Sequence, residues 1–146
     1  MASSNSSSSR APAMQRAYTR LAVTLYRLSG GAIGGRMAGE RVLLLTTTGR
    51  KSGQPHTVPI SYFEDNGTPF VIASNAGKEA YPAWYLNLSA NPRVEVQLGS
   101  RRWSATARIV GPEERQRLLA GVIAASAQRA ERQPRTREVP IVMLER

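Results

Sequence analysis

Apolar and polar residues follow two different spacings along this chain. Six short segments show strict alternation or a compact run of Leu, Val, Ile or Thr, which predicts β-strands. They cover residues 41–48, 56–63, 70–74, 93–98, 102–109 and 139–145. Three further segments have helical spacing, most with Pro or Gly at their borders, and predict helices at residues 14–28, 81–90 and 112–123.

The connections between the predicted strands are too short for parallel crossovers. Asn66 and Gly67 predict a hairpin turn, because both residues tolerate positive φ angles. Pro59 cannot donate a backbone hydrogen bond, so its strand requires an edge position or a bulge. The sequence therefore predicts a mainly β fold with flanking helices (α+β), in which six antiparallel strands form a closed or split barrel.

The N-terminal segment differs in composition from the rest. Residues 1–12 are Ser-rich and predict a disordered tail, residues 13–35 predict a basic amphipathic helix with a Gly-rich linker, and residues 36–146 form the barrel domain. Within the helix, arginines lie opposite one apolar face, which consists of Met14, Tyr18, Leu21, Leu25 and Leu28. Two interpretations are open: the apolar face packs on the domain, or residues 13–28 lie on an anionic membrane surface.

Composition narrows the classes of function. Twenty basic residues against ten acidic ones give a formal net charge of +10, which favours an anionic partner such as nucleic acid, phospholipid or a polyanionic small molecule. The arginines are scattered and no nucleic-acid module is present, so nucleic acid is not expected. The absence of Cys excludes zinc ribbons, iron–sulfur clusters and a thiol nucleophile, and a single histidine, His56, leaves no metal site expected.

No apolar run is long enough to cross a bilayer, and the N-terminus lacks the apolar segment of a signal peptide. The expected location is the cytoplasm, with peripheral contact at the inner face of the cell membrane as the alternative that the basic helix raises.

The segment TTTGRKSGQPH, residues 46–56, is the most informative for chemistry. Two glycines flank Arg50, Lys51 and Ser52 at a strand end, so backbone amides, two cations and a hydroxyl converge on one anion, while a solvated basic turn is the alternative. Further along, Trp84 and Leu88 are spaced for core packing, and Trp84 is also suited to contact a planar ring.

The motifs LLLTTTGRKSGQP, VPISYF, IASNAGK, PAWYLNLSANP and VPIVMLE, in this order, resemble the deazaflavin-dependent nitroreductase family. That resemblance spans residues 41–145. It implies a split β-barrel of the FMN-binding, pyridoxamine-phosphate-oxidase-like type, coenzyme F420 as cofactor rather than FMN, and hydride transfer to a quinone, nitroaromatic or activated alkene. A polyanionic cofactor agrees with the net charge, and a hydride carrier removes the need for a catalytic triad or metal.

The resemblance also implies a set of cofactor-binding residues. Carried over by position, the cofactor phosphate is held by Arg50, Lys51, Ser52 and His56. The deazaflavin groove is lined by Thr57, Val58, Pro59, Ile60, Ile72, Ala73, Ser74, Asn75, Ala83, Trp84 and Tyr85. No proton donor is identified; Tyr62 and Ser74 are the candidates.

Two departures from the family pattern stand out. His56 replaces a common Arg, which makes phosphate binding pH-dependent, and residues 124–138 lack the tyrosines that wall the substrate pocket of nitroimidazole reducers. Because no proton donor is identified, an alternative function is non-catalytic binding or storage of deazaflavin, FMN or haem, and a basic nucleic-acid-binding protein is the remote alternative. The expected assembly is a monomer or a homodimer.

Overall fold

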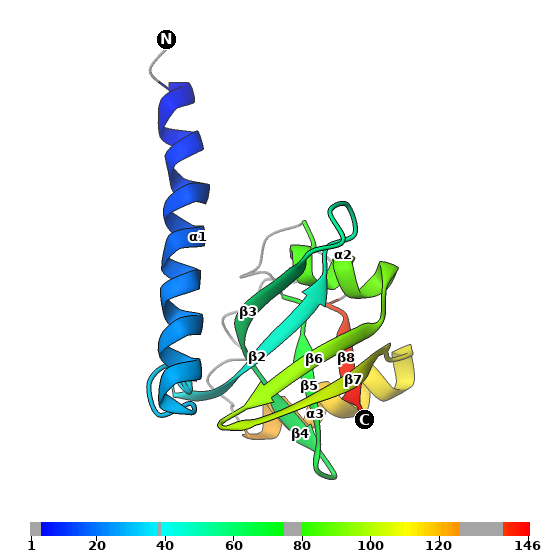
Figure 1. Cartoon of the computed structure of the whole chain (residues 1–146). Coiled ribbons are helices and arrows are strands. Elements are labelled where there is room, and N and C mark those ends of the chain that lie inside the picture. Colours follow the sequence, from blue (N-terminus) through cyan, green and yellow to red (C-terminus); the bar gives the residue numbers. More distant parts are fainter. Residues whose placement is uncertain (1–3, 38, 75–79, 126–138) are drawn as a thin grey trace.

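The computed structural model describes residues 4–37, 39–74, 80–125 and 139–146. Figure 1 shows the elements. In chain order they are α1 (Ser4–Ser29), β1 (Arg36–Met37), β2 (Glu40–Thr48), β3 (Pro55–Ser61), β4 (Phe63–Asp65), β5 (Thr68–Ile72), α2 (Ala83–Ala90), β6 (Arg93–Leu98), β7 (Arg101–Ile109), α3 (Pro112–Ala125) and β8 (Ile141–Glu145).

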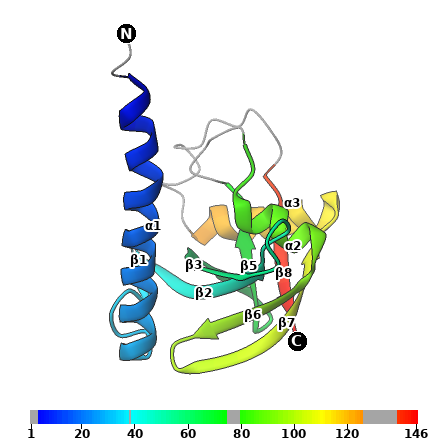
Figure 2. The ribbon, with the colours of Figure 1, turned by 45° about the horizontal axis from the view of Figure 1, so that its top comes forward.

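The strands form one strongly curved antiparallel sheet (Figure 2). Its order is β1-β2-β6-β7-β8-β5-β4, and β3 pairs with β2. Among the described residues no ladder joins β3 to β4, so the barrel stays open between these two strands. The predicted fold class, a mainly antiparallel sheet with flanking helices, is confirmed.

The strand count differs from the prediction because one predicted strand divides. We predicted a continuous strand over residues 56–63, but β3 pairs with β2 and β4 pairs with β5, and Tyr62 lies between them. With the short β1, the sheet has eight strands rather than six. The expected edge position of Pro59 on β3 and the hairpin at Asn66 and Gly67, with φ angles of 51° and 83°, are both confirmed.

Strands β2 and β8 are buried on both faces by other parts of the protein, which explains their continuous apolar runs. Leu43 and Leu45 point into the barrel core, whereas Val42 and Leu44 pack under α1. In β8, Val142 faces the barrel core and its neighbours Ile141 and Met143 pack in a second cluster with Leu118 of α3. A strand buried on both faces has no polar face, so it reads as a continuous run of apolar residues rather than an alternating one.

Helix α1 differs from the prediction at its start and in the face that it buries. It begins at Ser4, inside the segment that we expected to be disordered, rather than at Met14. Its contact with the sheet uses Val23 and Tyr26, and the five apolar residues expected to pack on the domain are exposed. In Figure 1 the N-terminal half of α1 projects beyond the sheet.

Tyr26 anchors α1 through its hydroxyl as well as its ring. The hydroxyl donates to the Val42 carbonyl at 2.9 Å and accepts from the Gly99 amide at 2.9 Å, and the side chain is 1% exposed. One buried side chain therefore joins the helix to β2 and to the β6–β7 turn, which explains why the helix docks at this point.

Candidate functional site

The bend between β2 and β3 forms a compact loop that holds the predicted cations. The Gly49 amide donates to the Gln54 carbonyl and the Gly53 amide donates to the Gly49 carbonyl, both at 2.8 Å. Gly53 has a φ angle of 71°, which favours glycine. These bonds set the path of residues 49–54, which we call the cradle loop, and Lys51 at its tip has no side-chain partner among the described residues.

The lack of a side chain at Gly49 leaves room for two neighbouring side chains. A Cβ atom at this position would lie 2.6 Å from Ser52 Oγ and 2.8 Å from His56 Nε2. The absence of a side chain therefore lets the hydroxyl and the imidazole close over the backbone, where Ser52 Oγ lies 3.5 Å from His56 Nε2. Both side chains are exposed to solvent, and both line the same pocket as Arg50 and Lys51.

The side chain of Asn87 on α2 supports the cradle loop through hydrogen bonds, a role that the sequence alone did not assign to it. Its Oδ1 accepts from the Arg50 backbone amide at 3.2 Å and from Arg50 Nη1 at 2.9 Å, and its Nδ2 donates to Thr47 Oγ1 at 3.2 Å. Asn87 is 4% exposed. The one available signal was a single amide in the apolar helix sequence AWYLNL, because a buried amide needs hydrogen-bond partners.

A pocket of about 330 Å³ opens beside the cradle loop. Its wall brings together seven residues of the predicted cofactor site: Arg50, Lys51, Ser52, His56, Val58, Ala83 and Trp84. Thr47, Gly49 and Asn87 complete it. The pocket therefore has a cationic, hydroxyl-bearing rim at the loop and an apolar wall from β3 and α2, which suits an anionic ligand that carries a planar ring.

The other predicted site residues of β3 lie outside this pocket. Thr57 lies on the α1 side of the strand, where it bonds Thr46 Oγ1 at 2.8 Å and accepts from Arg27 Nη2 at 3.3 Å. Pro59 shares that face by strand alternation, and Ile60 packs against the barrel core. Because side chains alternate between the two faces of β3, only the residues of one face, such as His56 and Val58, can line the pocket.

Three more predicted residues lie at the end of β5 and one on α2. Ile72 packs in the cluster under α3, Ala73 is fully buried, and Ser74 is half-buried at the last described position of this segment. Tyr85 packs against the barrel core and contacts Tyr81 with ring centroids 5.0 Å apart and ring planes inclined by 39°. Asn75, also predicted, lies outside the described residues.

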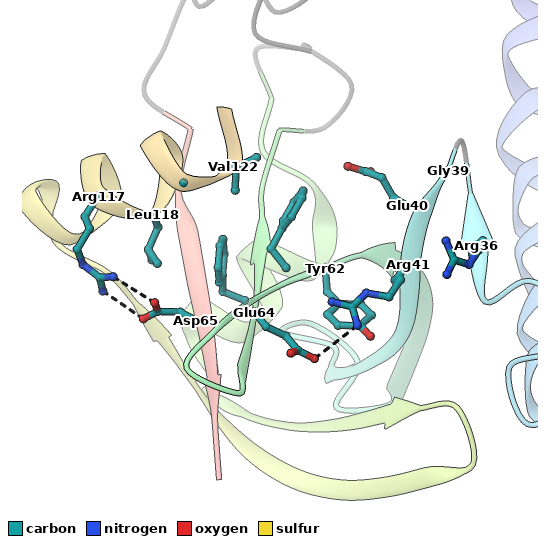
Figure 3. A pocket seen from close by; sticks show the side chains of 13 residues that line it. Arg36, Gly39, Glu40, Arg41, Tyr62, Glu64, Asp65, Arg117, Leu118 and Val122 are labelled. Carbon is teal, nitrogen blue, oxygen red and sulfur yellow. Dashed lines mark hydrogen bonds and ion pairs between the residues drawn. The ribbon is translucent and has the colours of Figure 1, made fainter. Parts of the chain in front are cut away.

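Tyr62, one of the two candidate proton donors, lines a different pocket of about 520 Å³ (Figure 3). Burial raises the pKa of its phenol, although the Arg41 guanidinium, 5.1 Å from the ring centre, opposes this shift. Arg41 also lies 4.0 Å from Glu64, and Arg117 makes two hydrogen bonds to Asp65. In this second pocket these two arginines are therefore neutralised by Glu64 and Asp65. The cradle loop, in contrast, is cationic.

The described residues hold neither a set of metal ligands nor a helix that could span a membrane. No three His, Asp or Glu side chains come together there as a set of metal ligands. None of the helices in this part of the chain combines the length and apolar character needed to span a membrane.

The sequence of this chain is similar to a known protein family and to a mycobacterial relative. The F420H(2)-dependent quinone reductase family matches residues 18–146. The F420H(2)-dependent quinone reductase Rv1261c of Mycobacterium tuberculosis (strain ATCC 25618 / H37Rv) is 42% identical over 96 residues, which are 65% of this chain and 64% of that relative. The chain thus matches slightly less than two thirds of that relative's length.

Two solved structures are similar. An F420-H2 dependent reductase (FDR-A) has 38% sequence identity and a TM-score of 0.63, covering 71% of this chain and 93% of that one. A protein described as a domain-swapped dimer has 36% identity and a TM-score of 0.65, covering 84% and 93%. The match over residues 18–146 includes the whole sheet and the cradle loop, and the chain belongs to the F420H(2)-dependent quinone reductase family.

Proposed function

We propose that this protein is an F420-dependent oxidoreductase that transfers a hydride from the reduced deazaflavin to a quinone. The observation that carries the proposal is the cradle loop, with its cationic rim and apolar wall, in a member of this family. Quinones are the substrate class in the name of the family and of the mycobacterial relative. Nitroaromatics and activated alkenes form the wider class that the same chemistry would reduce.

The residues present fit such a cofactor. Lys51 and the Ser52 hydroxyl would hold its phosphate, and Arg50, fixed by Asn87, would add a second cation at a set position. Trp84 and Val58 would contact the ring or its linker. When bound, the deazaflavin supplies the hydride, so the protein needs to provide orientation, dry contact and a proton.

Two residues are candidates for the proton donor. Tyr62 carries its proton at neutral pH, as phenols do, and burial raises its pKa further, but it faces the second pocket. Ser74 lies at the end of β5, half-buried. Both residues remain candidates, to be separated by the pH dependence of quinone reduction in Tyr62→Phe and Ser74→Ala.

The assembly and location are also proposals. The similar structure described as a domain-swapped dimer supports a homodimer rather than a monomer. A cytoplasmic location agrees with a small-molecule reductase, and contact of residues 13–28 with an anionic membrane stays a prediction.

The test of the cofactor site is Lys51→Ala. Loss of a hydrogen bond to a charged group predicts a weakening of F420 binding by about 1.5–3 kcal/mol, roughly 10- to 150-fold in Kd, measured by titration of deazaflavin fluorescence. Arg102→Ala on β7 is the matched control, because it removes the same charge from an exposed position outside the pocket. Equal affinity in Lys51→Ala and wild type would refute the assigned role.

Catalysis is tested separately from binding. Reduced F420 is mixed with the wild-type protein and a quinone, and the oxidation of the cofactor is followed by its absorbance, with FMN as the control cofactor. Binding without turnover over a panel of quinones, nitroaromatics and enones would favour the storage alternative.

A further inference from the structure

Helix α1 turns an apolar stripe away from the domain. Val23 and Tyr26 bury one face of the helix against β2. The opposite face carries five large side chains, which we call the α1 stripe: Met14, Tyr18, Leu21, Leu25 and Leu28, exposed by 71%, 75%, 57%, 37% and 81%. A contiguous apolar surface of this kind on a soluble domain marks an interaction site.

The spacing of the α1 stripe is that of a helix–helix seam. Its members follow one another at intervals of four, three, four and three residues. This is the heptad pattern with Tyr18 and Leu25 at one core position and Met14, Leu21 and Leu28 at the other. The stripe is narrow, two positions in seven, whereas a helix that packs on a globular core has a wider apolar face.

Between residues 17 and 29 the borders of the stripe are small and uncharged. Ala17 and Thr24 flank it on one side, and Ala22 and Ser29 flank it on the other. The Thr24 hydroxyl donates to the Arg20 carbonyl at 2.8 Å and the Ser29 hydroxyl donates to the Leu25 carbonyl at 2.7 Å. Neither hydroxyl therefore needs a partner from outside, and the small side chains allow a second helix to approach closely.

Three of the four arginines of α1 lie away from the stripe, and Arg10 falls at its border one turn before Met14. At about 100° per residue, Arg16, Arg20 and Arg27 fall on the opposite half of the helix. Arg27 is turned towards the sheet, where its Nη2 donates to Thr57. Between residues 17 and 29, therefore, no cation stands beside the apolar face, where a long basic side chain could cover apolar surface and reach an anionic headgroup.

We propose that the α1 stripe packs against the α1 stripe of a second copy of this chain. A twofold dimer places the same patch on both sides of the interface, and the borders between residues 17 and 29 bring no like charges together when the stripe pairs with itself. This inference deepens the homodimer proposed above by naming its surface. It uses no residue of the cradle loop or its pocket, so it stands apart from the cofactor site.

The test measures mass in solution by sedimentation equilibrium over a concentration series of the full chain. The variants are Leu21→Lys/Leu25→Lys and Leu21→Glu/Leu25→Glu, both at exposed positions. The matched control is Ile109→Lys, an exposed apolar residue on β7 that is 44% exposed. We expect wild type and control to be dimers, each double variant to be a monomer, and an equimolar mixture of the two double variants to form dimers again.

A second measurement uses the absence of Cys from the chain, because a single introduced thiol reports one contact. Two single variants, Met14→Cys and Leu28→Cys, are each oxidised alone and as an equimolar mixture. Cross-linking within each variant alone indicates a parallel seam, and cross-linking only in the mixture indicates an antiparallel one. No cross-link in any combination would contradict the seam.

Each other outcome is decisive. Dimers that persist in both double variants overturn the stripe as the interface while leaving a homodimer intact. A wild-type monomer overturns both. If that monomer pellets with vesicles of phosphatidylglycerol and phosphatidylcholine, and Leu21→Glu/Leu25→Glu does not, the stripe belongs to a membrane surface instead. Unchanged F420 affinity in all variants keeps these results separate from the proposed function.

Discussion

Asn87→Ala tests whether the cradle loop depends on the amide beneath it. The change deletes the acceptor of both Arg50 hydrogen bonds, at 3.2 and 2.9 Å, and the donor to Thr47 Oγ1 at 3.2 Å. Thr47 is 1% exposed, so water cannot readily replace the lost partner. An unsatisfied buried polar group and a lost bond to a guanidinium together predict a destabilisation of about 2–4 kcal/mol.

The same change is expected to weaken F420 binding through Arg50 as well as through the loss of the Asn87 amide from the pocket wall. Arg50 loses its fixed position, so the ligand must order it on binding. Stability is measured by urea unfolding and affinity by deazaflavin fluorescence. Ser89→Ala is the matched control, because its exposed hydroxyl bonds only the Tyr85 carbonyl of the same helix, at 2.8 Å. If Asn87→Ala matches Ser89→Ala in both stability and affinity, the argument for Asn87 as a support is refuted.

Two further predictions concern the rest of the fold. Tyr26→Phe leaves the Val42 carbonyl and the Gly99 amide without the hydroxyl and should lower the free energy of unfolding by about 1–3 kcal/mol, whereas the exposed Tyr18→Phe should not; equal losses would contradict the anchoring role. Hydrogen bonds from Arg117 hold the pKa of Asp65, the only Asp in the chain, below its usual value of about 3.9. Because the folded pKa is the lower one, the pair stabilises the fold above the unfolded pKa and this contribution disappears as pH falls through the folded pKa; NMR titration should show a depressed midpoint that returns to normal in Arg117→Ala, and an unchanged midpoint would show that the pair has no such effect.

The candidate site was predictable where the chemistry lies within one short segment. The glycines of residues 49–53 and the neighbouring cations are close in sequence, and local turn geometry brings them together without help from the rest of the chain. Val58, Ala83 and Trp84 came from the resemblance, and they do line the same pocket. Asn87 was missed because its role depends on the distance between α2 and the end of β2, which no local pattern contains.

Local patterns were sufficient to predict most of the helices and strands, because strand alternation, the Asn66–Gly67 turn and the prolines at helix starts act over a few residues. Tertiary structure decided which face each element buries and where a strand changes partner. Helix α1 buries Tyr26 rather than its most apolar face, since the tyrosine hydroxyl finds two buried backbone partners from distant strands. Such choices depend on residues more than fifteen positions apart, and periodicity along the chain carries no information about them.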